Sequence, residues 1–389
     1  MTYPCEIPPL EIGGLVARLP IVQGGMGVGI SLSGLASAVA RAGGVGVISA
    51  ALVGFFEGEA EFFKNPTEAN IRGLKRQIAE ARRKAPEGIL GVNIMVALTD
   101  YEPLVKAACE AGADVIFSGA GLPLNLPELR PEGAPTRLVP IVSSARAAKL
   151  VTQRWWSRYG LVPDALVVEG PKAGGHLGFE IEKLESEDSR LEKQIPEVIK
   201  VIRPFEEKAG RSIPVIAAGG IYTGRDIYRY LHQLGAAGVQ MGTRFVATQE
   251  CDASPAFKEA FLRARREDLT IIKSPVGLPG RALKGPFLQA VEAGEKRPYK
   301  CMYHCLRTCD YQKSPYCIAA ALINAQRGNL EAGFVFAGAN AWRVDRIVSV
   351  KELLDELLEE YCAAREEASQ SPSTFSTTGA RKRPSEVTS

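Results

Sequence analysis

A (β/α)₈ TIM barrel of the α/β class, with a C-terminal insertion that contains cysteines, is the fold that this 389-residue sequence predicts. Short apolar runs that end in small residues recur along the chain, and a longer segment with helical periodicity follows most of them. The runs number eight. Eight repeats of a strand followed by a helix favour a closed barrel. The alternative is an open doubly wound sheet.

The predicted strands are almost continuously apolar. Parallel strands of a barrel are buried on both faces, by helices outside and by side chains within, so polar and apolar residues need not alternate along them. In chain order the strands are expected at residues 19–24, 45–50, 89–97, 113–119, 137–144, 165–170, 213–219 and 238–245.

Helices are predicted between these strands at residues 33–41, 68–84, 101–111, 144–154, 195–208 and 223–234, with a last amphipathic helix at 350–364. Residues 180–193 are highly charged and are expected to form an exposed excursion. We expect one barrel domain over residues 1–362, including an insertion at 281–330 that holds a cysteine group. Residues 363–389, rich in Ser, Thr and charge, are expected to be a disordered tail.

Composition excludes several classes of protein. A net charge of +3 without a concentrated basic region does not suggest binding to nucleic acid or to a membrane surface. The longest uncharged apolar stretch, residues 42–56, is shorter than the roughly 20 residues that span a bilayer. The first residues lack the basic and then apolar pattern of a secretory signal, so a cytoplasmic location is expected.

A phosphate site is predicted at the ends of the seventh and eighth strands, where barrels of this class often bind phosphate. The residues are Gly219-Gly220 and Gly242-Thr243. Glycine lets backbone N–H groups approach an anion closely. The alternative is that these glycines serve only tight turns between strand and helix.

The first strand ends in a glycine-rich run that contains Gly24, Gly25 and Met26. Such a run suits the close approach of a flat group to the backbone, and the isoalloxazine ring of a flavin is one such group. Asn93 is a polar residue in the apolar third strand. Its amide is expected to bind the ring or, alternatively, to satisfy neighbouring loop backbone. Together with the phosphate loops, these residues predict bound FMN.

His176 is the candidate catalytic residue. It follows Gly174 and Gly175 in the loop after the sixth strand, at the expected mouth of the barrel. Imidazole titrates near neutrality and can remove a proton from a carbon acid. The alternative is an ordinary surface-loop histidine. His232 lies on a predicted helix, and His304 lies inside the cysteine group. Neither is therefore a good candidate for the base.

Four cysteines fall within 17 residues near the C-terminus, namely Cys301, Cys305, Cys309 and Cys317. In a helix, the first three would share one face because they are four residues apart. Thiolates so arranged suit a [4Fe–4S] cluster or Zn²⁺, and in a chain of this size a metal site is a better interpretation than a set of disulfides. The alternative is a helical segment with incidental buried cysteines.

Six motifs in order resemble the nitronate monooxygenase family, formerly called 2-nitropropane dioxygenases, which includes the FMN-type enoyl-ACP reductases. They are QGGMGVGIS, GVNIMV, EGPKAGGHLG, IPVIAAGGI, GVQMGTRF and SPVGLPGRAL, between Leu19 and Phe287. The resemblance implies an FMN-binding barrel with His176 as base. It implies flavin contacts at Gly24, Gly25, Met26, Asn93, Gly174, Gly175, Gly219, Gly220, Gly242 and Thr243. Lys172 departs from the family pattern and receives no role.

Three functions remain open from the sequence. The first is a nitronate monooxygenase that oxidises nitronates or nitroalkanes with O₂. The second is an NAD(P)H-dependent enoyl-ACP or quinone reductase. The third, which depends on the cysteine group, is a flavin and iron–sulfur protein that passes electrons to a redox protein partner.

Overall fold

Eight parallel strands close into a barrel in the computed structural model, which describes residues 5–295, 301 and 303–370. The order around the barrel is β10-β11-β3-β4-β5-β6-β7-β8, and β11 pairs with β3 to close it. Each strand lies within its predicted range, so the predicted barrel is confirmed. The strands are β3 (Ile21–Gln23), β4 (Val45–Ser49), β5 (Ile89–Met95), β6 (Val115–Gly119), β7 (Arg137–Val142), β8 (Leu166–Glu169), β10 (Val215–Ala218) and β11 (Gly238–Met241).

The interior of the barrel is a packed core of branched and aromatic side chains. Val47, Phe117, Val139 and Val167 belong to one buried cluster there. Side chains alternate between the two faces of a strand, so the residue two positions after each of these also faces inward. At the carboxyl ends of the strands this places polar residues, including Glu169, at the mouth of the barrel.

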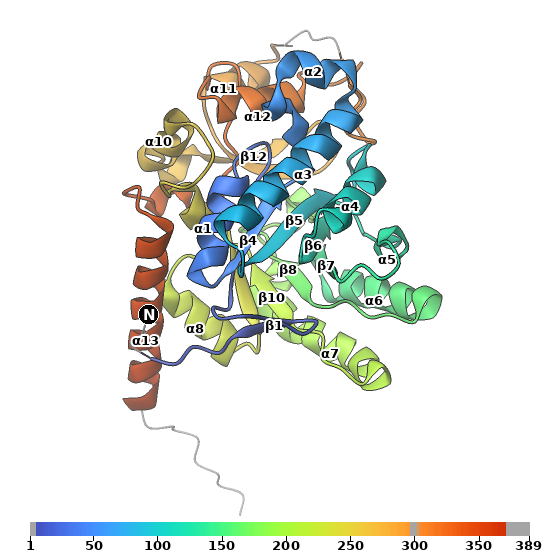
Figure 1. Cartoon of the computed structure of the whole chain (residues 1–389). Helices are drawn as coiled ribbons and strands as arrows, with labels where there is room; N and C mark the ends of the chain where they lie inside the picture. Colours follow the sequence, from blue (N-terminus) through green and yellow to red (C-terminus); the bar gives the residue numbers. More distant parts are fainter. Residues whose placement is uncertain (1–4, 296–300, 302, 371–389) are drawn as a thin grey trace, which may run out of the picture.

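The other end of the barrel is closed by an N-terminal hairpin that was not predicted. Its strands are β1 (Leu10–Ile12) and β2 (Leu15–Ala17), and Leu10 packs in the same cluster as the barrel interior. A Cβ atom on Gly238 would lie 3.0 Å from a methyl carbon of Leu10, which shows how closely the hairpin seats on the strands. Figure 1 shows β1 at the end of the molecule opposite to β12.

Helices cover the outside of the barrel (Figure 1). The six predicted between strands are confirmed, and α8 is capped by reciprocal hydrogen bonds between Thr223 and Asp226. These helices are α1 (Ser33–Ala42), α3 (Pro66–Lys84), α4 (Tyr101–Glu110), α6 (Ala145–Tyr159), α7 (Leu191–Ala209) and α8 (Gly224–His232). Shorter elements are η1 (Val53–Glu57), α2 (Glu59–Lys64), α5 (Leu126–Leu129), η2 (Ile181–Lys183), η3 (Glu187–Ser189), α9 (Thr243–Val246), α10 (Pro255–Arg263), η4 (Arg266–Asp268) and η5 (Ala341–Arg343).

The last helix, α13 (Val350–Gln370), packs along α8 and α1. It continues past the boundary expected at residue 362, because Tyr361 and Ala364 are still buried against the barrel helices. Residues 363–370, which were expected to belong to a disordered tail, are therefore helical, and residues 371–389 lie outside the described residues. A disulfide joins Cys362 of this helix to Cys5, a pair that the sequence analysis did not foresee. No described helix is both long and apolar enough to cross a membrane.

A small antiparallel sheet, here called the mouth sheet, lies beside the barrel mouth. It consists of β12 (Leu269–Lys273), β13 (Pro279–Leu283) and β9 (Gly175–His176). The turn between β12 and β13 is the Ser274–Leu278 segment, and Ser274 N–H donates to the carbonyl of Leu278 at 3.1 Å. This sheet joins the loop after β8 to a segment almost a hundred residues later in the chain.

The cysteine segment is not helical, which corrects the expected stripe of Cys301, Cys305 and Cys309. Helices flank it, α11 (Pro286–Glu292) before and α12 (Ile318–Gln326) after, but residues 303–317 form turns and loops. The segment lies alongside the loop after β5 and is hydrogen-bonded to it. Thr99 N–H donates to the Cys305 carbonyl at 3.0 Å, and Arg307 N–H donates to the Ala97 carbonyl at 2.9 Å. These backbone bonds, rather than a helical repeat, set its shape.

Candidate active site

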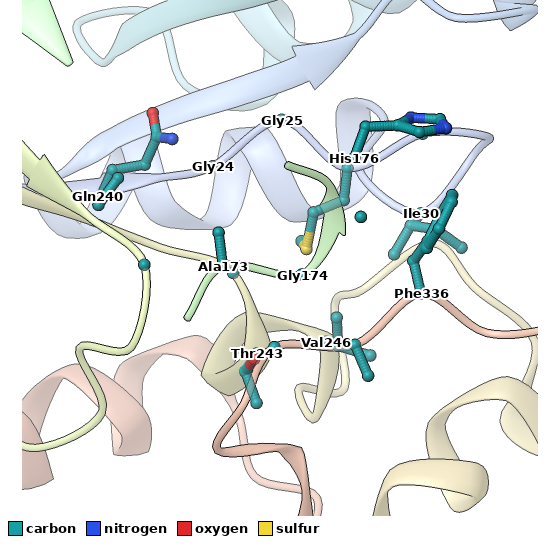
Figure 2. Close-up of a pocket in the computed structure, with 18 of the residues that line it drawn as sticks. Gly24, Gly25, Ile30, Ala173, Gly174, His176, Gln240, Thr243, Val246 and Phe336 are labelled. Carbon is teal, nitrogen blue, oxygen red and sulfur yellow. The ribbon is translucent and has the colours of Figure 1, made fainter. Parts of the chain in front are cut away.

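One cavity of about 270 Å³ opens at the carboxyl ends of the barrel strands. The structure brings all eleven predicted flavin and catalytic residues to its wall, although they come from four different loops and from strand β5. In Figure 2, His176 and Phe336 lie at one end of the pocket and Gln240 at the other. The residues are Gly24, Gly25, Met26, Asn93, Gly174, Gly175, His176, Gly219, Gly220, Gly242 and Thr243.

The loops after β10 and β11 present unused backbone donors. The backbone N–H groups of four residues donate no hydrogen bond to another described residue. They belong to Gly219, Gly220, Gly242 and Thr243. Gly219 has a φ of 96° and Gly220 a φ of 88°, a conformation that side chains other than glycine rarely adopt. The turn thus needs glycine, and it also leaves several donors for an anion in one place.

The glycine-rich loop after β3 lies directly on β5. A Cβ atom on Gly25 would lie 2.2 Å from the Cβ of Asn93, so only glycine fits there. The Asn93 amide makes no hydrogen bond to another described residue. The alternative, in which this amide satisfies loop backbone, therefore finds no support, and the amide is free to bind a ligand in the cavity.

His176 is fixed by the mouth sheet. It pairs with Gly280 of β13, and its Nε2 lies 2.8 Å from the hydroxyl of Ser274. The ring of Phe336 packs edge-on against the imidazole, with 5.0 Å between ring centroids. This is a held side chain at a cavity wall and not a loose surface histidine.

Burial lowers the pKa of His176 to about 4. No ion pair to a described carboxylate offsets this effect, so the imidazole is neutral at neutral pH. A neutral imidazole has one nitrogen lone pair that can accept a proton, which is the state a general base requires.

Glu169 is a site residue that the sequence analysis missed. It ends β8, lines the cavity, and has a pKa that burial raises to about 7. Its carboxyl makes no hydrogen bond or ion pair with any described residue. One signal was available: Glu169 opens the EGPKAGGHLG motif that ends in the predicted base.

Three further residues at or beside the cavity were not assigned. Ser274 and Phe336 orient His176, and they lie far from it in sequence, so no local pattern could pair them with it. Lys172 lines the cavity, and its side chain passes over Gly220, with the Lys172 Cβ 2.8 Å from where a Gly220 Cβ would stand. Among described residues Lys172 makes no ion pair, so its charge is available to a ligand.

The cysteine group does not form a metal site in the described part of the chain. No group of three or more His, Cys, Asp or Glu side chains there is arranged to hold a metal ion. Burial raises the pKa of the Cys305 thiol to about 12, and the neighbouring Cys317, Cys301 and Cys309 contribute to the same shift. The predicted [4Fe–4S] cluster or Zn²⁺ therefore has no support in the described structure.

Comparisons with known proteins identify the family of this chain. The family model for nitronate monooxygenase matches residues 11–360. The (3aS,4S,5R,7aS)-5-hydroxy-7a-methyl-1-oxo-octahydro-1H-indene-4-carboxyl-CoA dehydrogenase of Mycobacterium tuberculosis is 27% identical over 371 residues, 87% of this chain and 92% of that protein. A probable nitronate monooxygenase of Staphylococcus aureus is 28% identical over 304 residues, 72% of this chain and 79% of that protein.

Among solved structures, FabK from Thermotoga maritima is similar to this chain with a TM-score of 0.69 and 29% identity. The similarity covers 90% of this chain and 95% of that one. The matched residues include all eight barrel strands, the mouth sheet and every residue that lines the cavity. The chain therefore belongs to the nitronate monooxygenase family and is an oxidoreductase.

Proposed function

We propose that this chain is an FMN-dependent nitronate monooxygenase, with nitronates and nitroalkanes as its substrate class and O₂ as its oxidant. The observation that supports the proposal best is the neutral, oriented His176 at the wall of a cavity whose opposite loops offer unused backbone donors. Bound FMN would supply the redox chemistry, taking electrons from the substrate carbanion and passing them to O₂. The protein would supply binding, orientation and proton transfer.

The residues present fit FMN. Gly219, Gly220, Gly242 and Thr243 would bind its phosphate through backbone N–H groups, and Lys172 beside Gly220 would offset the phosphate charge. Gly24, Gly25 and Met26 would lie against the ring, where Gly25 leaves no room for a side chain, and Asn93 would bind a polar ring atom. Gly174 and Gly175 complete the wall on the side of His176. We propose FMN and not FAD, because these loops offer one group of unused donors, enough for one terminal phosphate.

We assign the proton of the neutral imidazole to Nε2, where it is donated to the Ser274 hydroxyl oxygen. Nδ1, which makes no hydrogen bond with a described residue, then holds the lone pair that removes the α proton of a neutral nitroalkane. A substrate that enters as the nitronate has already lost that proton, and His176 would then orient the anion.

A second candidate is an NAD(P)H-dependent reductase of enoyl thioesters or quinones. Two observations favour it: the similarity to FabK at 29% identity, and a relative whose name gives a carboxyl-CoA compound as its substrate. The third function, electron transfer through an iron–sulfur cluster to a protein partner, is favoured by no observation in the described structure. A cytoplasmic location also remains a proposal.

The test begins with the cofactor. Mass analysis of the flavin released from purified protein should give FMN, and stoichiometric FAD would contradict the proposed site. Anaerobic stopped-flow reduction with a 2-nitropropane nitronate, with NADH or with NADPH then separates the two functions. Rapid reduction by nitronate and uptake of O₂ on mixing with air support the nitronate monooxygenase. Rapid reduction by NAD(P)H followed by reoxidation with crotonyl-CoA supports the reductase instead.

A further inference from the structure

The glycine turn after β10 is held by side chains that reach it from distant parts of the sequence. Gly219 and Gly220 both have positive φ, and neither N–H donates to another described residue. Glycine loses more conformational freedom than any other residue when it is ordered. Asn340 donates to the Gly220 carbonyl at 2.7 Å. The shape of the turn therefore depends on contacts of this kind and not on backbone hydrogen bonds of its own.

Arg244 holds the far end of the same turn, although it belongs to the loop after β11. It follows Thr243 in α9, and its side chain is only 11% exposed. Its Nη1 donates to the Tyr222 carbonyl at 3.2 Å, and its Cζ lies 4.7 Å from the centroid of the Tyr222 ring. The N–H of the same peptide unit, that of Thr223, donates to Asp226 at 2.9 Å. Arg244 thus joins the two loops that present the unused donors.

The C-terminal helix α13 holds Arg244 in turn. Nη2 of Arg244 donates to the Glu356 carboxylate at 2.9 Å, a contact across 112 residues of sequence. Glu360 lies one turn later on the same face of α13 and accepts the Gly224 N–H at 2.6 Å. No described residue of α13 lines the cavity. The helix therefore supports the two loops from outside the site.

We infer that Arg244 is a positioning residue for the cofactor phosphate, which fixes the loop after β10 against the loop after β11, and that Glu356 acts through it. This inference rests on the proposed function, because it takes FMN as the ligand. Arg244 does not line the cavity, so it would act on the backbone donors and not on the phosphate itself. Donors that already point to one place bind an anion more tightly, because binding then costs less ordering of the loop.

The test compares FMN with riboflavin, which has the same ring and lacks the phosphate. Binding of each to the full-length chain freed of flavin is followed by quenching of flavin fluorescence. In Arg244→Gln, affinity for FMN should fall by about tenfold, the effect of losing one hydrogen bond from a charged donor. Affinity for riboflavin should change by less than about twofold.

Two further variants sharpen the comparison. Arg244→Lys keeps the positive charge but lacks the planar fork that reaches Tyr222 and Glu356 together, so it should lose FMN affinity as Arg244→Gln does. This conservative change also carries the test if Arg244→Gln does not fold. Arg343→Gln is the matched control, because Arg343 also lies over the Tyr222 ring, at 4.2 Å, while the Tyr222 carbonyl is bound by Arg244. Its affinities should equal those of the wild type.

A double-mutant cycle tests the link to α13. Glu356→Gln alone should weaken FMN binding and leave riboflavin binding unchanged. When it is combined with Arg244→Gln, the loss should be no larger than that of Arg244→Gln alone, because both changes remove the same support. Losses that multiply would show that Glu356 does not act through Arg244.

The outcomes separate the two proposals. An unchanged ratio of FMN to riboflavin affinity in Arg244→Gln would overturn the positioning role and leave the cofactor proposal standing. Equal losses for both flavins would show a general effect on the fold, and full FMN affinity in Arg244→Lys would show that charge alone is needed; either result also overturns the role. Failure of FMN to bind the wild type would overturn the cofactor proposal, and the inference with it.

Discussion

Two ionisable side chains, His176 and Glu169, line the same cavity, and burial shifts both toward their neutral forms. The pKa of His176 falls to about 4 and that of Glu169 rises to about 7. At neutral pH the fixed charge on the cavity wall is therefore mainly that of Lys172. An anion such as a nitronate or a flavin phosphate enters without meeting a full negative charge, and the base is ready to accept a proton.

His176→Ala should retain bound FMN but lose on the order of 10²- to 10⁴-fold in kcat/KM on a neutral nitroalkane, because the general base is gone. The corresponding nitronate should be affected less, since its proton has already left. Steady-state O₂ consumption on both substrate forms measures this. His304→Ala, an exposed histidine outside the cavity, serves as the control. Equal and small effects on both substrates would remove His176 from the role of base.

Glu169→Gln should make the apoprotein more stable than the wild type at high pH. The folded-state pKa of Glu169, about 7, lies above the ordinary value of 4.5 for a glutamate, so the folded wild type binds its proton more tightly than the unfolded chain does. The wild type is therefore less stable than the variant above pH 7, and this difference in stability disappears as the pH falls toward 4.5. The advantage of the variant should grow from near zero at pH 4.5 to about 2–3 kcal/mol at pH 9.

Urea unfolding at pH 5, 7 and 9 checks this prediction without any cofactor. His176 contributes in the opposite sense, because its pKa is lowered: its stabilisation is present above pH 6.5 and is lost as the pH falls toward 4. Both proteins contain His176, so its effect cancels in the comparison. A stability difference between the two proteins that does not change with pH would show that folding does not shift the pKa of Glu169.

The structure brings the predicted residues together where a motif marks the end of a strand. The glycine pairs and His176 follow predicted strands, Asn93 lies near the end of one, and the barrel brings such ends to one mouth. Ser274 and Phe336 could not be found in this way, because a contact across 98 residues, such as that between His176 and Ser274, depends on how the mouth sheet folds back. The roles assigned to the predicted residues stay predictions until the cofactor and variants are tested.

At the scale of elements, α8 and α13 meet with no space between them at Gly224. A Cβ atom there would lie 1.9 Å from the Leu357 carbonyl oxygen and 2.5 Å from the Tyr361 nitrogen. Backbone atoms of a long helix cannot give way cheaply. Gly224→Ala should therefore destabilise the fold by about 2 kcal/mol or more.

Gly285→Ala is the matched control, because no atom lies within 4 Å of its added Cβ and its φ of −152° is open to any residue. It should change stability by less than about 0.5 kcal/mol. Equilibrium unfolding in urea compares the two variants. Equal stability of both would mean that α13 does not pack on α8 as described.

The elements that sequence predicted well are those with strong local patterns. Every barrel strand lies inside its predicted range because buried parallel strands are continuously apolar. The β1–β2 hairpin and the mouth sheet were missed, since their strands are short and their pairing depends on distant partners. The cysteine segment was wrongly expected to be helical because its spacing matched a helix, while its backbone in fact bonds to the loop after β5.

At the scale of the whole molecule, the cavity joins loops from both ends of the barrel sequence, so a bound cofactor should hold the fold together. FMN at 100 times its dissociation constant should stabilise the protein by about 2.7 kcal/mol. The thermal midpoint should rise with added FMN and should rise less with riboflavin, which lacks the phosphate that Gly219 and Gly242 would bind. Differential scanning fluorimetry over a series of concentrations measures both. Equal shifts for FMN and riboflavin would argue against the phosphate site.

The bond between Cys5 and Cys362 also changes what unfolding means for this chain. With a sequence separation of 357 residues, it makes one covalent ring of nearly all the described protein, and all eight barrel strands lie within that ring. In the chain-entropy model, closing so long a loop removes about 5–6 kcal/mol of freedom from the unfolded ensemble. While the bond is intact, heat or urea can open the barrel but cannot separate the two ends of its sequence. Refolding would then start with the segment that forms α13 already linked to the segment that forms the N-terminal hairpin.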